Sequence, residues 1–257
     1  MFAMECEEGT FVVRFFVEEQ QVEECLVNIT GSDARHIGKV LRQHPGDILT
    51  IVWRQQAWQS QIEIVSEDAI IARLLEPLAE TKEPPLQVYL LQGIAKGERM
   101  DMVMQKSVEL GVGAIIPVHT RYTVVELSAK KAVARQERWQ KIAESAAKQC
   151  GRLAIPQVYP VLPLEEALAA VPSDCRLIMP WEKTDDCSFA QILKEPAPAK
   201  AGLIIGPEGG LAPEEALLAQ EKGASLVSLG KRILRTETAA ITALSILMYQ
   251  WGDVGSD

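Results

Sequence analysis

The segment GLIIGPEGGLA (202–212) decides the fold class, because it joins an apolar strand to a glycine-rich loop. The run GLII is typical of a strand that a sheet buries on both faces. In the GPEGG loop (206–210), three glycines in five residues allow the backbone to approach a ligand closely and to adopt positive φ. The loop matches neither a Walker sequence nor a dinucleotide fingerprint, so it predicts no obvious phosphate cradle. From spacing alone, a tight turn from strand to helix is an equally good interpretation.

On both sides of this segment, the chain alternates between apolar strands and helices. The predicted strands comprise residues 86–94, 114–118, 176–180, 202–206 and 225–230. The predicted helices comprise residues 99–110, 135–149, 213–222 and 236–251. This alternation predicts an α/β fold with a mostly parallel sheet that helices cover on both faces. Ligands of such sheets bind beyond the carboxyl ends of the strands, so we expect the loops after residues 180, 206 and 229 to converge.

The loop 229–238, which leads into the last predicted helix, combines charged and apolar side chains. Its positively charged residues are Lys231, Arg232 and Arg235. Thr236 is the predicted N-cap of the helix. Ile233 and Leu234 are apolar residues in a polar stretch, which predicts an apolar slot for a purine ring or a thioether.

The first eighty residues have a different character, with short β-branched segments separated by turn signals. The strands predicted here comprise residues 11–17, 48–53, 59–65 and 69–75. One short helix is expected to begin at a cap on Ser32 or Asp33. Several short strands with one helix predict a small barrel. The adjacent prolines of TKEPP (81–85) mark the expected boundary with the α/β part, because proline has no backbone donor and favours extended chain.

The net charge of 26 − 35 = −9 argues against a nucleic-acid binder, because attraction to phosphate needs a basic surface. The distribution is uneven, however. Residues 1–27 carry seven Glu against one Arg, whereas residues 28–54 carry four Lys or Arg against two Asp. Residues 120–152 carry eight Lys or Arg against three Glu. A local basic face is compatible with these counts, although solvated helix faces are the simpler interpretation.

The five cysteines include no C-x-x-C pair, which argues against a disulfide framework and against a zinc site. We therefore expect no metal. No apolar run approaches the roughly 20 residues that a membrane-spanning helix requires. The N-terminal MFAMECEEGT carries acid where a secretory signal carries base, so we expect a cytoplasmic protein with no membrane partner.

Two C-terminal segments, GPEGGL (206–211) and LGKRILRTETAAITAL (229–244), resemble motifs of the SPOUT class of S-adenosylmethionine-dependent RNA methyltransferases. The segments GIAKGERMDMVMQKSVELGVGAIIPV (93–118) and AAKQCGRLAIPQV (146–158), with RFFV and DARHIGKVLR near the N-terminus, narrow the resemblance. Over about residues 13–252 the chain resembles the RsmE family, which methylates N3 of a uridine in the decoding region of 16S rRNA.

The resemblance implies a PUA-like RNA-binding β-barrel followed by a SPOUT-type parallel-sheet domain with a deep trefoil knot, assembled as a homodimer. The expected divisions are an acidic N-terminal extension (1–12), the barrel (13–80), a linker (81–85) and the methyltransferase domain (86–257). The extension departs from the family, whose chains usually begin at the RFF segment. Helix 236–251 is apolar on several sides, which predicts a deeply buried helix or a dimer contact.

The resemblance also implies S-adenosylmethionine as the methyl donor, with S-adenosylhomocysteine as the product. The residues expected to bind it are Met179, Pro180, Gly206, Pro207, Glu208, Gly209, Gly210, Leu229, Gly230, Ile233, Leu234 and Thr236. The glycines among them suit a folded-back cofactor that needs close main-chain contact.

Neutral uridine carries a proton on N3, so the implied reaction needs a base or a cation that stabilises the uridine anion. Arg235 is the expected cation. Glu237 is expected to hold the backbone or an arginine in place rather than to act as the base. Arg121, beyond an earlier strand end, is the third candidate catalytic residue.

The implied partner is 16S rRNA or the assembled small ribosomal subunit. The residues expected to contact RNA are Arg14, Arg35, His36, Lys39, Arg42, Lys96, Arg99 and Arg152. Arg35, Lys39 and Arg42 recur at helical spacing, which predicts a basic stripe on one helix face. His36 is equally well interpreted as an ordinary polar helix residue, and Arg152 as part of the subunit interface.

Other functions are compatible with parts of this pattern. A SPOUT enzyme that acts on tRNA or 23S rRNA would carry the same motifs. A non-catalytic RNA-binding module for ribosome assembly is disfavoured by the intact cofactor motifs, and a dinucleotide-dependent oxidoreductase by the missing fingerprint. Gln105 and Lys106 stand where relatives that methylate the ribose carry Asn and a catalytic Arg, which favours the base as the target.

Overall fold

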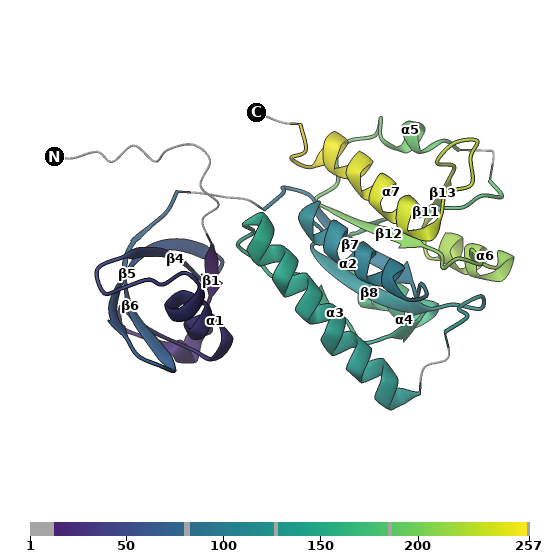
Figure 1. Ribbon diagram of the computed structural model, residues 1–257. Helices are drawn as coiled ribbons and strands as arrows, with labels where there is room; N and C mark the ends of the chain where they lie inside the picture. Colours follow the sequence, from purple (N-terminus) through teal and green to yellow (C-terminus); the bar gives the residue numbers. More distant parts are fainter. Residues whose placement is uncertain (1–12, 80–82, 126–127, 185–186, 256–257) are drawn as a thin grey trace. The chain divides into compact units, whose positions relative to one another are not determined.

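The computed structural model describes residues 13–79, 83–125, 128–184 and 187–255. The expected acidic extension and residues 81–82 of the expected linker lie outside the described residues. The chain divides into two compact units (Figure 1). The first unit comprises Met1–Lys82 with Lys148–Ala154, and the second comprises Glu83–Ala147 with Ile155–Asp257.

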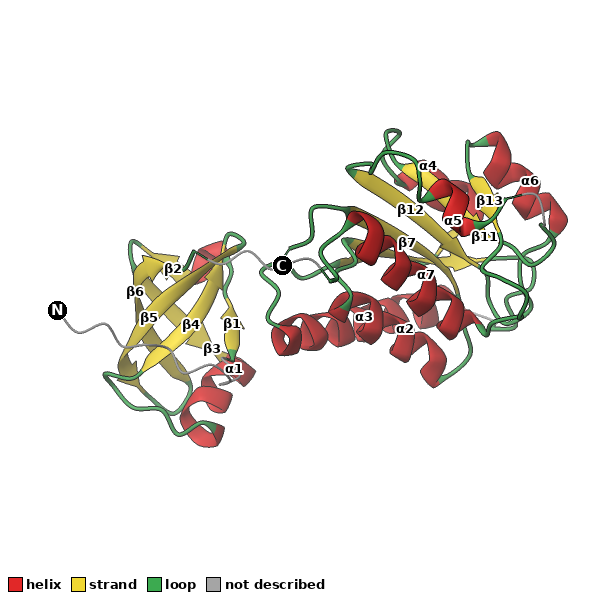
Figure 2. Ribbon diagram, turned by 90° about the horizontal axis from the view of Figure 1, so that it is seen from above, coloured by secondary structure: helices red, strands yellow, loops and turns green. Residues whose placement is uncertain are grey.

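The first unit is a curved six-stranded sheet around one apolar core (Figure 2). Its strands are β1 (Arg14–Phe16), β2 (Val22–Glu23), β3 (Leu26–Thr30), β4 (Ile48–Trp53), β5 (Gln56–Val65) and β6 (Ala69–Pro77). In the order β1-β4-β5-β6-β3-β2, the first pair is parallel and the following pairs are antiparallel. Phe15, Val27, Ile51, Ile62 and Ile70 come from five of these strands and share one buried cluster, so the sheet curls around them.

A short helical segment follows β3. It consists of α1 (Gly31–Arg35), which continues directly into the π-helix η2 (His36–Val40). The expected N-cap at Ser32 or Asp33 is wrong, because the strand runs straight into the helix and Thr30 takes the cap position. A single turn of 3₁₀-helix, η1 (Glu19–Gln21), precedes β2.

The second unit is a parallel sheet with helices on both faces (Figures 1 and 2). Its strands are β7 (Gln87–Gly93), β8 (Ala114–His119), β9 (Gln157–Val158), β10 (Leu162–Pro163), β11 (Arg176–Pro180), β12 (Lys200–Ile205) and β13 (Ser225–Val227). Its helices are α2 (Glu98–Glu109), α3 (Ala129–Cys150), α4 (Leu164–Ala170), α5 (Phe189–Ile192), α6 (Pro213–Glu221) and α7 (Thr236–Trp251), and the end of α3 from Lys148 onward belongs to the first unit. The strand order is β10-β8-β7-β12-β11-β13, with β9 beside β8, and each of these pairs is parallel. The predicted α/β fold is confirmed, whereas the trefoil knot stays a prediction.

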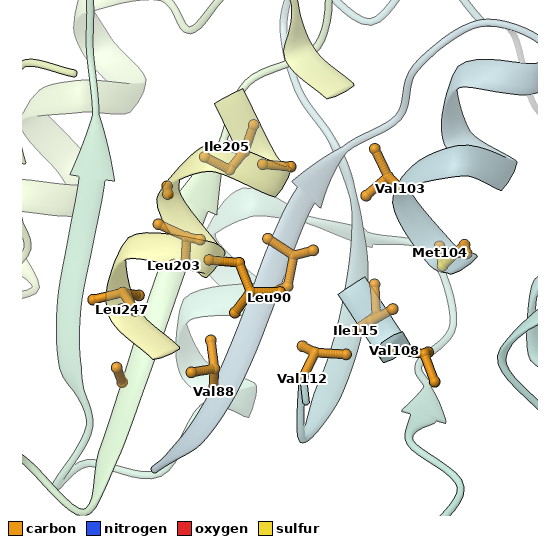
Figure 3. Packing of buried hydrophobic residues seen from close by; sticks show 14 of the residues in the cluster. Val88, Leu90, Val103, Met104, Val108, Val112, Ile115, Leu203, Ile205 and Leu247 are labelled. Atoms are coloured by element: carbon orange, nitrogen blue, oxygen red, sulfur yellow. The ribbon is translucent and has the colours of Figure 1, made fainter. Parts of the chain in front are cut away.

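Neighbouring residues of the central strands point into two separate cores. Leu90 and Leu203 pack with Leu247 in the cluster that α2, α3 and α7 cover (Figure 3). Leu91 and Ile204 belong to the opposite cluster, which α4 and α6 cover. Burial on both faces explains why these strands are continuous apolar runs. It also holds the strand ends, and the loops that follow them, in fixed positions.

Several elements differ from the prediction. Helix α3 begins at Ala129 rather than at residue 135, and β13 ends at Val227 rather than at residue 230. The short elements β3, α4 and α5 have no counterpart among the predicted elements. Helix α7 has the predicted bounds, but Arg235 rather than Thr236 is its N-cap. Thr236 is instead the first helical residue, and its hydroxyl bonds outside the helix.

Within the described residues, no helix is long and apolar enough to cross a membrane. The same residues contain no group of three or more side chains suited to hold a metal ion.

Candidate active site

A cavity of about 630 Å³ lies beyond the carboxyl ends of β11, β12 and β13, where a parallel sheet is expected to bind ligands. Three loops line it: residues 180–182, residues 206–211 and residues 228–237. The lining is completed by Arg99, Ile205 and Ala239. The three loops that the sequence predicts to converge therefore do meet in the structure.

The GPEGG loop lies directly against the end of β7. A Cβ atom at Gly93 would come 2.5 Å from Pro207 Cδ, so the close approach requires glycine there. On the loop itself, Glu208 Oε1 accepts hydrogen bonds from the Lys96 N–H at 2.8 Å and from Arg99 Nη1 at 2.8 Å. Burial raises the pKa of Glu208, but these hydrogen bonds outweigh burial and leave the pKa below its ordinary value. Glu208 is therefore ionised at neutral pH and fastens the loop to the segment after β7.

Arg99 also approaches a second carboxylate. Its Nε lies 3.9 Å from Glu237 Oε1, and the Glu237 side chain is only 13% exposed. Glu237 Oε2 is buried and has no hydrogen-bond partner among the described residues. Because buried carboxylate oxygens are normally hydrogen-bonded, this atom is suited to receive a donor or a cationic group of a ligand.

The loop 228–237 presents both charged and apolar groups to the cavity. Leu234 is half-buried, whereas Ile233 is 87% exposed although it lines the cavity. Arg235 is exposed and lines the cavity as well. The buried Thr236 donates a hydrogen bond from Oγ1 to the Gly206 carbonyl at 2.6 Å, which ties this loop to the GPEGG loop.

Most residues predicted for the site line this cavity. They are Pro180, Gly206, Pro207, Glu208, Gly209, Gly210, Leu229, Gly230, Ile233, Leu234, Arg235, Thr236 and Glu237. Met179 is not among them, and its side chain is fully buried in the core under α4 and α6, so contact between its backbone and the cofactor stays a prediction. Arg121 lines a separate depression with Tyr122 and Gly209, and its guanidinium pairs with Glu214.

The residues expected to contact RNA fall into different environments. Those exposed on the surface are Arg35, Lys39, Arg42 and Lys96. The His36 ring is half-buried and packs at 6.2 Å from the ring of Phe15. Arg14 and Arg152 are only 4% and 5% exposed, so they do not present a surface to RNA. Arg99 belongs to the cavity.

The sequence argument expected the loop after β11, which contains Trp181 and Glu182, at the site, but it did not single out Gln92. Trp181 and Glu182 line the cavity after β11, and Trp181 Nε1 donates to the Leu211 carbonyl at 3.4 Å. Gln92 lies behind the cavity at the end of β7 and bonds to Thr236. A polar residue closing an apolar strand was the available signal for Gln92, whereas its partner lies 144 residues away.

Comparison with known proteins agrees with this architecture. The family model named RNA methyltransferase domain matches residues 82–248, and the family model named RNA methyltransferase PUA domain matches residues 29–75. The ribosomal RNA small subunit methyltransferase E of Bacillus subtilis is 35% identical over 247 residues, which cover 92% of this chain and 96% of the relative. This chain belongs to the ribosomal RNA small subunit methyltransferase E family. The resemblance that its motifs indicated is confirmed.

Two similar proteins, one of them named as a methyltransferase E, have been solved with a ligand. The structure of the Neisseria gonorrhoeae member bound to S-adenosyl methionine is 36% identical, with a TM-score of 0.83 over 95% of this chain and 99% of that chain. A methyltransferase from Legionella pneumophila, in complex with the bound cofactor SAM, is 35% identical, with a TM-score of 0.81 over 94% and 99%. The fold of both units of this methyltransferase E chain is therefore shared with proteins that bind this cofactor.

Proposed function

We propose that this protein is an S-adenosylmethionine-dependent methyltransferase that methylates N3 of a uridine in 16S rRNA. The observation that carries the proposal is the cavity in which the GPEGG loop meets the loop 228–237, in a chain of the methyltransferase E family. The solved relative from Neisseria gonorrhoeae binds S-adenosyl methionine.

The residues of the cavity fit this cofactor. Its volume of about 630 Å³ is within the range of roughly 300–1,000 Å³ that is usual for small-molecule sites. Pro180, Leu229 and Leu234 provide apolar walls for a purine ring, and backbone groups of the GPEGG loop lie open to polar contact. The unpartnered Oε2 of Glu237 suits a cationic ligand.

The reaction requires the chain to orient the uridine and to manage one proton. S-adenosylmethionine supplies a methyl group already activated as a sulfonium, so no metal or covalent nucleophile is needed. Arg235 lines the cavity, and its side chain makes no ion pair within the described part of the chain. We assign it the role of stabilising negative charge on the uracil ring when N3 loses its proton.

The other two candidate catalytic residues have partners. Glu237 approaches Arg99 at 3.9 Å, which supports its role in holding an arginine. Arg121 is paired with Glu214, and its backbone N–H donates to Glu215 Oε1 at 2.8 Å. Both residues are therefore better suited to fix the site than to take the proton.

Base methylation is also favoured over ribose methylation. On α2, Gln105 is exposed, and Lys106 Nζ pairs with Glu109 at 2.8 Å. Lysine lacks the planar donor fork of an arginine, and this lysine is already engaged by a carboxylate. The segment therefore lacks the side chains that ribose-methylating relatives use.

The proposed partner is 16S rRNA, alone or within the assembled small subunit in the cytoplasm, and RNA binds the exposed basic residues of the first unit. These residues are Arg35, Lys39 and Arg42. We further propose that the protein acts as a homodimer. Helix α7 supports this, because Tyr249 on its outer side is 70% exposed.

The experiment is mass spectrometry of ribosomal RNA from a strain that lacks this protein, with and without the wild-type gene restored. The expected result is loss of one 3-methyluridine from 16S rRNA, and its return with the wild-type protein. A missing mark in tRNA or 23S rRNA would identify a different RNA target. No missing mark together with defective subunit assembly would identify a non-catalytic RNA-binding protein.

A further inference from the structure

A buried amide lies behind the candidate active site. Gln92, the penultimate residue of β7, is completely buried in the second unit. Its Nε2 donates two hydrogen bonds of 2.9 Å, one to its neighbour's carbonyl at Gly93 and one to Thr236 Oγ1. Both protons of the amide are therefore used.

The direction of these hydrogen bonds is determined by Thr236. The Thr236 hydroxyl has one proton, which it donates to the Gly206 carbonyl at 2.6 Å. Towards Gln92 the same oxygen can only accept, so Gln92 must present its amino group. The chain of donors therefore runs from Gln92 through Thr236 to Gly206.

This hydrogen-bond chain connects β7, which lies behind the cavity, to two segments of the cavity wall. Gln92 is the penultimate residue of β7, Gly206 opens the GPEGG loop and Thr236 is the first residue of α7. The contact between Gly93 and Pro207 is so close that a Cβ at residue 93 would lie 2.5 Å from the proline ring. The close contact fixes the spacing between β7 and the GPEGG loop, and the hydrogen bonds hold the start of α7 to both.

The remaining atom of the amide shows that this arrangement is not optimal for stability. Gln92 Oε1 is buried and has no hydrogen-bond partner among the described residues. A buried acceptor without a donor destabilises a fold, whereas an apolar residue of similar size would not. An amide kept at this position is explained by a role in the site.

We propose that Gln92 is a positioning residue for the cofactor: through Thr236 it fixes the spacing between the GPEGG loop and the start of α7. The inference rests on the proposed function, since it takes S-adenosylmethionine as the ligand of the cavity. Gln92 itself is absent from the cavity lining and acts only through Thr236.

The test is isothermal titration calorimetry with S-adenosylmethionine on full-length variants. Gln92→Leu removes the donor, and Thr236→Val removes the hydroxyl while keeping the shape. Each is expected to weaken cofactor affinity about tenfold or more, as expected for a lost buried hydrogen bond. Thr236→Ser keeps the hydroxyl and should recover most of the affinity that Thr236→Val loses.

A third substitution, Gln92→Glu, adds a readout that packing alone would not change. The ionised carboxylate has no donor and draws the Thr236 proton away from Gly206, whereas the neutral carboxyl group can donate to Thr236. Burial raises the pKa of a carboxyl group, so the neutral form is reached near mildly acidic pH. As the pH falls from about 8 to about 5.5, the cofactor affinity of Gln92→Glu should therefore rise relative to that of wild type.

The matched control is Ser107→Ala on α2, which also alters a fully buried polar side chain without a hydrogen-bond partner among the described residues. It should leave cofactor affinity unchanged, and thermal unfolding without cofactor will show which variants are folded. If the wild-type protein binds S-adenosylmethionine, and folded Gln92→Leu and Thr236→Val bind it with full affinity, the inference is overturned but the proposed function is not. If Gln92→Leu does not fold, two other results together overturn the inference. The cofactor affinity of Gln92→Glu would follow that of wild type across pH, and Thr236→Val would bind the cofactor as tightly as Thr236→Ser. A wild-type protein that does not bind S-adenosylmethionine overturns the proposed function as well.

Discussion

At the scale of single residues, ion pairing distinguishes the cations in and near the cavity that are held by carboxylates from those that are not. Arg99 is held by Glu208, and Arg121 is held by Glu214. The pKa of Glu208 lies below its ordinary value, so its pair with Arg99 persists at neutral pH. Lys231, Arg232 and Arg235 line the cavity without such a partner in the described residues, and Arg235 is the one that caps α7. A guanidinium without a carboxylate partner is the group best able to respond to charge that develops on a substrate.

Arg235→Ala is therefore expected to slow methyl transfer by roughly 10²- to 10³-fold, about 3–4 kcal/mol, as for the loss of one donor to a developing anion. Affinity for cofactor and RNA should fall far less, because the interaction is made mainly in the transition state. The measurement is a single-turnover rate at saturating cofactor and RNA across pH. Raising the pH should partly restore the rate, since more uridine is then ionised in bulk solution.

Arg235→Lys is the matched control for charge. It should recover part of the rate if charge alone stabilises the anion, and little if a bidentate fork is required. A near-normal rate for Arg235→Ala would overturn this role and leave Arg121, as a cation, or Glu237, as a base, as the next candidate. A slow variant with a flat pH profile would mean that Arg235 only orients the uridine.

Gly209 is a second residue whose substitution has a clear expected outcome. A Cβ here would lie 2.7 Å from Tyr122 Cβ, so a side chain forces the two loops apart. Gly209→Val should therefore weaken binding of S-adenosylmethionine at least about tenfold in calorimetry, because the loop shift distorts the cavity. The sequence argument related this glycine to close approach of a ligand, whereas the structure places the clash against Tyr122.

A compensating change tests this explanation. Tyr122→Gly removes the clashing Cβ, so Gly209→Ala combined with Tyr122→Gly should bind the cofactor better than Gly209→Ala alone. Equal affinity in these two proteins would show that the contact with Tyr122 is not the cause. Wild-type affinity in Gly209→Val would remove this residue from the site.

At the scale of elements, the basic stripe of the first unit (Arg35, Lys39, Arg42) follows helical spacing only in part. Arg35 ends α1, and Lys39 lies in the π-helix η2, whose residues have a different period. Arg42 follows the helix with a φ of 54°, so helical spacing does not determine its position. Lys39 makes a long ion pair of 3.9 Å with Glu67, with both side chains largely exposed. Such a pair is weak in water and leaves Lys39 available to RNA phosphate.

Arg35→Glu with Lys39→Glu should weaken RNA binding and leave cofactor binding intact. Wild-type affinity for RNA should fall with added salt, with a slope of about −0.7 to −0.9 per phosphate contact, and the variant should show a smaller slope. The measurement is fluorescence anisotropy with labelled 16S rRNA fragments at several salt concentrations. Lys194→Glu with Lys222→Glu makes the same change in net charge at exposed lysines of the second unit. Unchanged RNA affinity in the first variant would show that the stripe is a solvated face.

At the scale of the whole molecule, the two units have separate cores and separate proposed tasks. The core of the first unit gathers residues of β1, β3, β4, β5 and β6, and the second unit has one core on each face of its parallel sheet. The first unit is discontinuous in sequence, because Lys148–Ala154 belongs to it, and Leu153 is buried there with Val52 and Ala57. The proposed RNA surface and the proposed cofactor cavity thus depend on different cores.

Sedimentation analysis tests the proposed homodimer at this scale. The molecular mass measured for the wild-type protein should be twice the 28.3 kDa of one chain. Tyr249→Glu places a charge on an exposed part of α7 and should shift the equilibrium towards monomer if α7 forms the contact. Leu217→Glu on α6 is a control, because Leu217 is 57% exposed on another helix. A wild-type protein that sediments as a monomer would contradict the proposal.

The sequence by itself determined the elements whose signal is local. The strands 48–53 and 176–180 and the helix 236–251 have the predicted bounds, because apolar periodicity over a few residues is sufficient to specify them. The GPEGG loop and the loop 228–237 were recognisable for the same reason, as contiguous motifs at strand ends.

Only the tertiary structure decided which side chains meet. Gln92 bonds to Thr236 across 144 positions and Arg99 pairs with Glu208 across 109, and no local pattern encodes such pairs. Burial was equally invisible: Met179, Arg14 and Arg152 look like site or surface residues in sequence, but packing encloses them. The physical reason is that the pairing of parallel strands brings distant strand ends to one edge of the sheet. Contacts at that edge exist only after the whole sheet has formed.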